Sequence, residues 1–238
     1  MRRRHRCWAS GLLLAVLALA VGGCRLDAAI DVDLDRDGGG TLAVELVADR
    51  ALVTRAAASG TDPLRDLARR VDELAGWDAQ AREGPEGGRR VRLSAGFAGP
   101  DEFDRLVAGF TAALDAPELR PLESLSLELD QGVVRVRGAA ALRPGPAVSE
   151  LGYTPEQAVA ALADAVTYQV RLRVPGQVRD TNADRSTDGE LIWTVPAGGS
   201  VDVWAEADLP GGAMVPLLVG GAAAAGAAAL WLRRRAAA

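Results

Sequence analysis

Several stretches of the chain alternate strictly between apolar and polar residues. Side chains of a strand point alternately to its two faces, so a period of two with one polar side is typical of antiparallel strands covered on one face. Gln131-Gly132 is the expected turn between two of them. The apolar members are Ile30, Val32 and Leu34; Val91, Leu93, Ala95 and Phe97; Leu125, Leu127 and Leu129; Val134 and Val136; Tyr168, Val170, Leu172 and Val174; and Leu191, Trp193 and Val195.

Three other segments have apolar residues at helical spacing. Each begins with a proline at the first helical position, at Pro63, Pro100 and Pro155. Thr154 and Gln157 also have the spacing of a capping box. Residues 50–58 are expected to add a short helix. Because the helices return after each strand pair, we expect an α+β domain, a twisted antiparallel sheet with three amphipathic helices on one face.

The segment DVDLDRDGGG, residues 31–40, has two interpretations. A calcium loop that starts at Asp33 needs a glutamate at its twelfth position, where Val44 stands, with Glu45 one residue too late. A strand followed by a glycine turn explains every residue, so we predict a hairpin and no metal site. Residues 180–190 are expected to form a long polar hairpin loop, and weak calcium binding at either place remains an alternative.

The N-terminal residues indicate export and lipidation. A basic head precedes an apolar stretch at residues 11–21, which is too short to span a bilayer. The sequence Val21-Gly22-Gly23-Cys24 resembles the bacterial lipobox. We therefore expect a signal peptide over residues 1–23, cleaved between Gly23 and Cys24, and a diacylglyceryl group on the Cys24 sulfur. An ordinary signal peptide with a chance cysteine is the alternative.

The other end predicts a second anchor. Residues 214–232 carry no charge over 19 residues and precede three arginines, so a single transmembrane helix of about 28 Å is expected, with residues 233–238 cytoplasmic. Residues 24–213 would then form the extracytoplasmic domain, on the cell membrane. Gly220 and Ala224 have the spacing of close helix contacts, which leaves weak self-association open beside a plain alanine bias.

Composition excludes several function classes. All 27 basic residues are arginines, and residues 24–213 hold 20 of them beside all 32 acidic residues, a net formal charge of −12. Such a domain repels phosphate backbones, so no nucleic-acid partner is expected. The only histidine is His5 and the only other cysteine is Cys7, which leaves no histidine- or thiol-based nucleophile in residues 25–213. We expect no cofactor and no enzyme.

Four features resemble the LppM-type lipoprotein domain family of actinobacteria: the lipobox cysteine, the early strand-turn-strand, the spacing of Asn182 and Trp193, and the terminal apolar stretch that ends in arginines. The resemblance implies an α/β domain related to lipid binders and an envelope role that involves glycolipids such as phosphatidylinositol mannosides. Only Cys24, as the acylated residue, carries over by position.

A lipid or glycolipid ligand is the leading functional hypothesis. Aromatic side chains commonly line ligand cavities, so the candidate ligand residues are Phe97, Phe103, Phe110, Trp193 and Trp204. Core packing explains the first four more simply. Trp204 lies on the polar side of its strand, with Asp202 and Glu206, and is expected near the membrane or a ligand. A register slip or a bulge in this strand is the alternative. The alternative function is a structural or partner-binding module without a small-molecule ligand.

Overall fold

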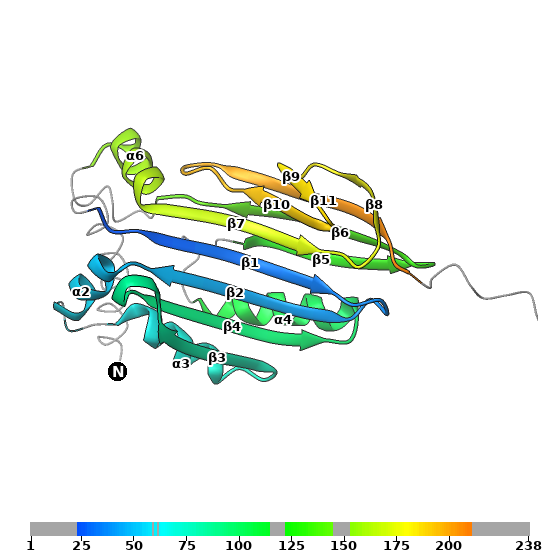
Figure 1. The fold of residues 1–238 in the computed structure, drawn as a ribbon, viewed down its shortest axis with the longest axis horizontal. Helices are drawn as coiled ribbons and strands as arrows, with labels where there is room; N and C mark the ends of the chain where they lie inside the picture. The colour runs from blue at the N-terminus through cyan, green and yellow to red at the C-terminus, as the bar shows by residue number, and fades with distance from the viewer. Residues whose placement is uncertain (1–22, 59, 61, 115–121, 145–152, 211–238) are drawn as a thin grey trace, which may run out of the picture.

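The structure is a computed structural model that describes residues 23–58, 60, 62–114, 122–144 and 153–210. Two β-sheets form its framework (Figure 1). The larger, sheet A, has the strand order β3-β4-β2-β1-β7-β10-β9, and the smaller, sheet B, has the order β5-β6-β11-β8. The strands of sheet A are β1 (Leu26–Leu34), β2 (Gly40–Ala48), β3 (Trp77–Glu83), β4 (Arg89–Phe97), β7 (Val166–Arg173), β9 (Arg185–Thr187) and β10 (Glu190–Thr194). Those of sheet B are β5 (Leu122–Asp130), β6 (Val133–Ala141), β8 (Gln177–Thr181) and β11 (Ser200–Asp208).

The helices predicted to begin at Pro63, Pro100 and Pro155 are present and begin at these residues. The described helices are α2 (Arg50–Ala58), α3 (Pro63–Asp72), α4 (Pro100–Ala113) and α6 (Pro155–Ala165), and η1 (Pro85–Gly87) is a 3-10 turn. The Thr154 side chain accepts from Gln157 N at 3.3 Å, and the Gln157 side chain accepts from Thr154 N at 2.9 Å. The capping box is therefore confirmed, and it starts α6 at Pro155.

The predicted sheet was correct in its strands and incomplete in its arrangement. β1 pairs with β2 in antiparallel register but with β7 in parallel register, so sheet A is mixed. The alternation of residues shows only that a strand has one covered face, and a parallel partner about 140 residues away leaves no trace in it. The existence of a second sheet was also missed, for the same reason.

Residues 31–40 form the predicted hairpin. Asp31 and Asp33 lie on the face of β1 opposite to Ile30 and Val32. The turn is closed by hydrogen bonds from Asp35 N to Gly39 O at 2.9 Å and from Gly38 N to Asp35 O at 3.2 Å. Gly38 has a φ of 86°, which an L-residue rarely adopts. The aspartates of β1 therefore lie on the face opposite to the core because of their register in a strand.

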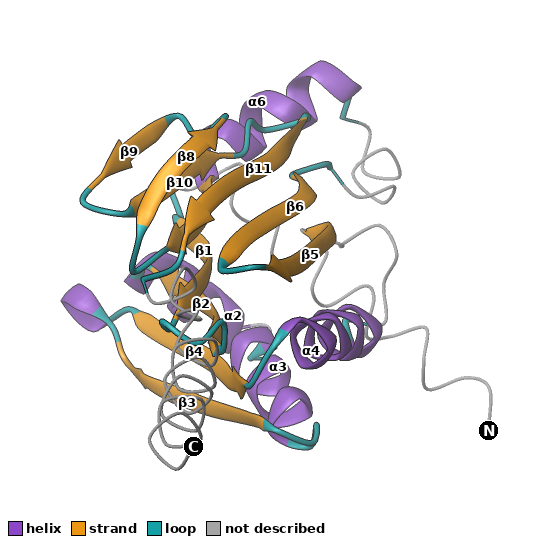
Figure 2. Cartoon of the chain, turned by 90° about the vertical axis from the view of Figure 1, so that its right-hand side faces the viewer, coloured by secondary structure: helices purple, strands orange, loops and turns teal. Residues whose placement is uncertain are grey.

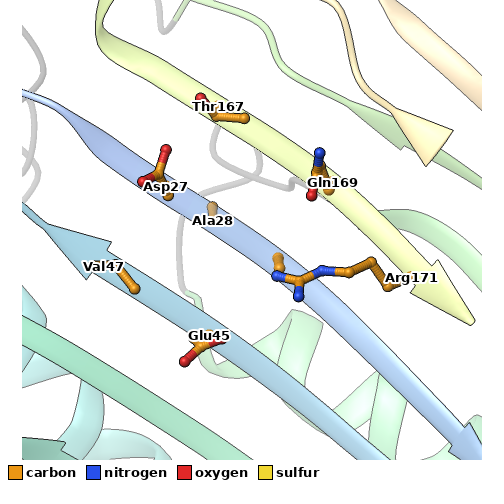
Figure 3. Close-up of a pocket in the computed structure, with 8 residues that line it drawn as sticks. Asp27, Ala28, Glu45, Val47, Thr167, Gln169 and Arg171 are labelled. Carbon is orange, nitrogen blue, oxygen red and sulfur yellow. The ribbon is translucent and has the colours of Figure 1, made fainter. Parts of the chain in front are cut away.

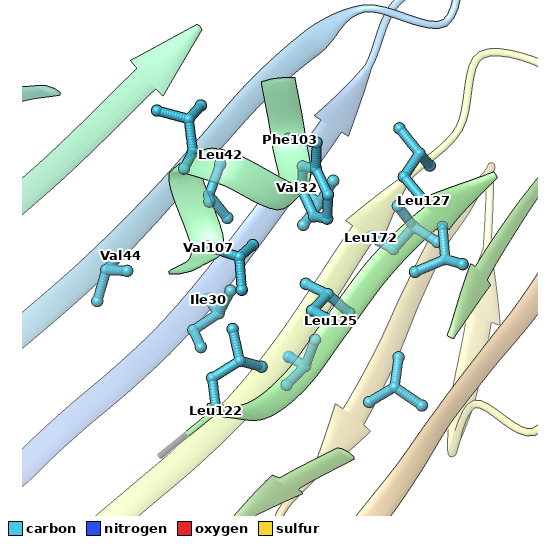
Figure 4. Close-up of a cluster of buried hydrophobic side chains, with 14 of the residues drawn as sticks. Ile30, Val32, Leu42, Val44, Phe103, Val107, Leu122, Leu125, Leu127 and Leu172 are labelled. Carbon is cyan, nitrogen blue, oxygen red and sulfur yellow. The ribbon is translucent and has the colours of Figure 1, made fainter. Parts of the chain in front are cut away.

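One face of sheet A is covered and the other is open. Figure 2 shows sheet B together with α3 and α4 on the same side of sheet A. α3 packs on β3 and β4, and α4 packs between β4 and the β5 strand of sheet B. Leu122, Leu125 and Leu127 of β5 meet the inner side chains of β1 and α4 in one apolar core (Figure 4). Within the described residues, no element covers the opposite, polar face of sheet A.

Two expectations need correction, and two predicted segments lie outside the described residues. Of the three helices expected on one face, α6 lies instead at one end of sheet A, directly before β7 (Figure 1). Residues 180–190 are not one long loop, because β8 ends in them and β9 pairs with β10 across a tight turn at Asp188-Gly189. The predicted signal peptide and transmembrane helix, residues 1–22 and 214–232, lie outside the described residues. No helix within the described residues is long and apolar enough to cross a membrane.

Candidate functional site

A shallow basin of about 230 Å³ opens on the uncovered face of sheet A (Figure 3). It lies where β1 runs between β2 and β7, toward the end of the sheet that carries α2 and α6. Its rim is polar and of mixed charge. The polar side chains that line it are Asp27, Glu45, Thr167, Gln169 and Arg171.

Strand register explains why the basin forms. Ala29 lies directly between Glu45 of β2 and Gln169 of β7. A methyl group flanked by two long side chains leaves a depression, and Ala29 forms its floor with 3% of its surface exposed. The next outward-facing row, toward α2, places Asp27 between Val47 and Thr167. An alanine among the outward aspartates of β1 is thus the residue that creates the hollow.

Arg171 lies at the other end of the basin and pairs with Asp31, which is not among the residues that line it. Arg171 Nε lies 3.2 Å from Asp31 Oδ1 in an ion pair, but it lies outside hydrogen-bonding geometry and is buried without a hydrogen-bond partner. Burial raises the pKa of the Asp31 carboxyl above its ordinary value, against the opposing effect of Arg171 and then Arg92. Glu45 and Glu190 raise this pKa further. The basin therefore combines one guanidinium, Arg171, with the carboxylates of Asp27 and Glu45.

Cys24 lies at the end of sheet A that carries α2 and α6. Its side chain is 1% exposed, in a small apolar cluster with Ala48, Leu52 and Ala165. Burial raises the pKa of its thiol. The following residue, Arg25, donates its backbone N–H to Asp49 Oδ2 at 2.7 Å. Asp27 at the rim is only three residues from Cys24, about 10 Å along an extended chain.

Four of the predicted ligand residues lie in the core. Phe103 and Trp193 are fully buried, and Phe97 and Phe110 are 5% and 3% exposed. Phe97 packs edge-on against Phe103 with ring centroids 5.0 Å apart, and Phe110 stacks on Trp77 at 5.3 Å. The structure therefore pairs Phe97 of β4 with Phe103 of α4, and it pairs Phe110 of α4 with Trp77 of β3. Their role in ligand binding stays a prediction.

Trp193 and Trp204 are joined through Asn182. The Asn182 side-chain oxygen accepts from the Trp193 indole Nε1 at 2.8 Å and from Trp204 N at 2.9 Å. The Trp204 side chain is partly exposed on the outer face of sheet B, as its alternation predicts. Its role near the membrane or a ligand stays a prediction. It is not among the residues that line the basin.

No group of three or more histidine, cysteine, aspartate or glutamate side chains that could hold a metal ion occurs in the parts of the chain that the structure describes. The outward carboxylates of sheet A pair with arginines instead. Arg173 reaches both Asp33 and Glu190 at 3.4 Å, and Arg90 reaches Glu45 at 3.2 Å. Ion pairs therefore link neighbouring strands on the face of sheet A around the basin.

These features define a two-sheet α+β domain with a polar basin close to a cysteine that precedes its first strand. No family model and no curated protein matches the chain. Among solved structures, the chain is similar to the NMR structure of the folded domain of Mycobacterium tuberculosis LppM. The TM-score is 0.49 at 14% identity, with 77% of this chain and 89% of that chain covered. The LppM-type domain expected from the sequence motifs agrees with this match.

The basin residues were missed by the sequence analysis. Three strands contribute to the basin, and the parallel pairing of β1 with β7 that brings Thr167, Gln169 and Arg171 to it is invisible in the alternation. One signal was present. Ala29 interrupts the outward row of Asp27, Asp31 and Asp33, and a small residue in a charged row marks a depression.

Proposed function

We propose that the protein is a cell-envelope lipoprotein, anchored by a diacylglyceryl group on Cys24 and by a transmembrane helix over residues 214–232. The lipobox and the terminal apolar stretch support this anchoring.

We further propose that the domain binds a lipid or glycolipid by its polar headgroup, in the basin on sheet A. The observation that carries this proposal is the basin's position: a hollow with hydrogen-bonding groups of both charge signs lies three residues from the anchored cysteine. Carboxylate, amide, hydroxyl and guanidinium groups together match the hydroxyl and charged groups of a headgroup. They do not match an acyl chain, whose burial needs apolar walls.

Binding through the acyl chains would need a different site. The aromatic side chains that could surround a chain are packed against one another, and the Trp193 indole N–H is already bonded to Asn182. An acyl chain would have to displace these contacts, and opening a packed core costs about 2–5 kcal/mol per large side chain lost. A headgroup enters the basin without such a cost. We propose a binding role without catalysis.

Lipids that remain bound to the protein test this proposal. The full-length protein is extracted from membranes in mild detergent, and its bound lipids are identified by native mass spectrometry. We expect a reproducible lipid adduct on the wild type that is lost in Ala29→Leu, because leucine fills the floor of the basin. The matched control is Ala139→Leu, on the outer face of sheet B opposite Asp202, which should keep the adduct.

Two further results separate the parts of the proposal. Gln169→Ala removes one wall group without adding volume and should weaken the adduct while the fold is kept. An adduct that is equally strong in both basin variants would contradict the site. A clean apo mass for the wild type would favour a partner-binding module without a lipid ligand.

The lipid anchor has its own test. Cys24→Ser should remove the diacylglyceryl mass and leave the signal peptide uncleaved.

A further inference from the structure

We propose that the domain lies along the membrane surface, with the long axis of its sheets roughly parallel to the bilayer, because its two tethers are short and leave from opposite ends. This inference rests on the proposed anchoring through Cys24 and residues 214–232. It concerns the geometry that such anchoring imposes.

The first tether has almost no length. β1 begins at Leu26, so Arg25 alone separates the lipidated cysteine from the sheet. Arg25 is also fixed, because its N–H donates to Asp49 and its carbonyl accepts from Asp49 N at 3.0 Å. Leu52 N in turn donates to Asp49 Oδ1 at 2.7 Å, which ties this corner to the start of α2. The start of β1 is therefore held directly at the lipid anchor.

The chain leaves the domain at the other end. β11 ends at Asp208, which pairs with Val133 at the start of β6. Leu209 N donates to Gly132 O at 2.8 Å, so the chain is still fixed beside the β5–β6 turn. This turn is next to the β1–β2 turn, because a Cβ on Gly38 would lie 2.5 Å from Leu129 Cδ2. Figure 1 shows the start of β1 and the end of β11 at opposite ends of the molecule.

The lengths exclude an upright domain. β1 has nine residues, so its two ends are about 30 Å apart. Between Leu209, the last residue with a bond to the fold, and Met214, where the proposed span begins, the chain makes five steps, with a reach of about 18 Å when fully extended. A domain that stood on its Cys24 end would carry Leu209 about 30 Å above the bilayer, beyond this reach. Both ends of the sheets must therefore stay close to the membrane.

Energy transfer from the two ends to the bilayer tests the orientation. The full-length protein is reconstituted into vesicles that contain acceptor-labelled lipids, with a donor dye on Thr54→Cys or on Asp130→Cys. Both residues are exposed. Thr54 lies on α2 near Cys24, and Asp130 lies at the β5–β6 turn. Acylation protects the Cys24 sulfur from the dye.

We expect similar transfer efficiency from the two positions. A matched variant carries a flexible insert of about 20 glycine and serine residues after Pro210, which adds a root-mean-square length of about 25 Å. The insert should lower the transfer from the Asp130 position and leave that from the Thr54 position unchanged.

Much weaker transfer from Asp130 than from Thr54 in the protein without the insert would overturn the proposal. An insert without effect would also overturn it, because the short tether would then not hold the far end. These results differ from a failure of the proposed anchoring. In that case the protein would not float with the vesicles, and intact mass spectrometry would show Cys24 without the diacylglyceryl mass.

Discussion

The Trp193 indole donates a hydrogen bond of 2.8 Å to the side-chain oxygen of Asn182, and through this contact the two sheets are joined. Trp193 lies in β10 of sheet A, and the same oxygen accepts from Trp204 N in β11 of sheet B. The Asn182 amide nitrogen donates to Asp202 O at 2.8 Å. The spacing between Asn182 and Trp193, noted as a motif, thus has a physical basis.

Asn182→Ala is expected to destabilise the fold. The substitution leaves the buried Trp193 N–H and the Trp204 N–H without their acceptor, and an unsatisfied buried donor costs about 1–3 kcal/mol. Urea unfolding followed by circular dichroism should show a loss in the free energy of unfolding of about 2–3 kcal/mol. Asp202→Ala is the control, because only its backbone carbonyl takes part, and it should change stability by about 0.5 kcal/mol or less. Equal effects of the two substitutions would contradict this role of Asn182.

Gly40→Ala is expected to disrupt the β1–β2 hairpin. A Cβ at Gly40 would lie 2.1 Å from Asp33 O, at a φ of 158°, so the strands must move apart. The contrasting variant is Gly109→Ala inside α4, where a Cβ meets nothing within 4 Å. It should stabilise the protein by about 0.5–1 kcal/mol through helix propensity. The midpoints of thermal unfolding should therefore move in opposite directions, and a tolerated Gly40→Ala would contradict the hairpin geometry.

Stability should fall with rising pH through the titration of Asp31. Burial raises the pKa of this carboxyl in the fold above its ordinary value of 3.8, so between the two values the folded state binds more protons than the unfolded state. The free energy of unfolding then decreases as the pH rises through that window. Asp31→Asn does not ionise and lacks this decrease.

The difference in stability between Asp31→Asn and the wild type should therefore grow in favour of the variant from acid to neutral pH. Urea unfolding at a series of pH values measures it, and the carboxylates that the two proteins share cancel in the difference. Arg171→Gln should raise the pKa of Asp31 further in a carbon-13 NMR titration, because Arg171 is the main opposing charge. A difference that shrinks with rising pH would refute the assigned direction.

Local sequence signals predicted the helices and strands of this fold, but they did not predict which distant strands pair. The Pro63, Pro100 and Pro155 starts and the alternation of Ile30 to Leu34 each depend on neighbours within a few residues, and these predictions were confirmed. The division into two sheets depends on pairings between strands that are distant in the sequence, such as β1 with β7 in sheet A and β6 with β11 in sheet B. No local pattern records that choice.

The candidate site shows the same difference between what local sequence signals predict and what long-range strand pairing decides. Aromatic residues were favoured as ligand residues because they commonly line cavities, but Phe103 and Trp193 are buried in the packed core. The basin depends on one small residue, Ala29, and on its neighbours Glu45 and Gln169 in adjacent strands. Their juxtaposition became visible only once the register of β1 with β7 was known.

The most direct test of headgroup binding is an NMR titration of the protein in nanodiscs with headgroup analogues, prepared by deacylation of envelope lipids. We predict shifts of the Ala29 amide and the Gln169 side-chain amide and no shift of the Trp193 indole N–H. Shifts centred on the Trp193 indole would contradict the account, since the ligand would then enter the core. No shift at either place would also contradict it and would favour the partner-binding module.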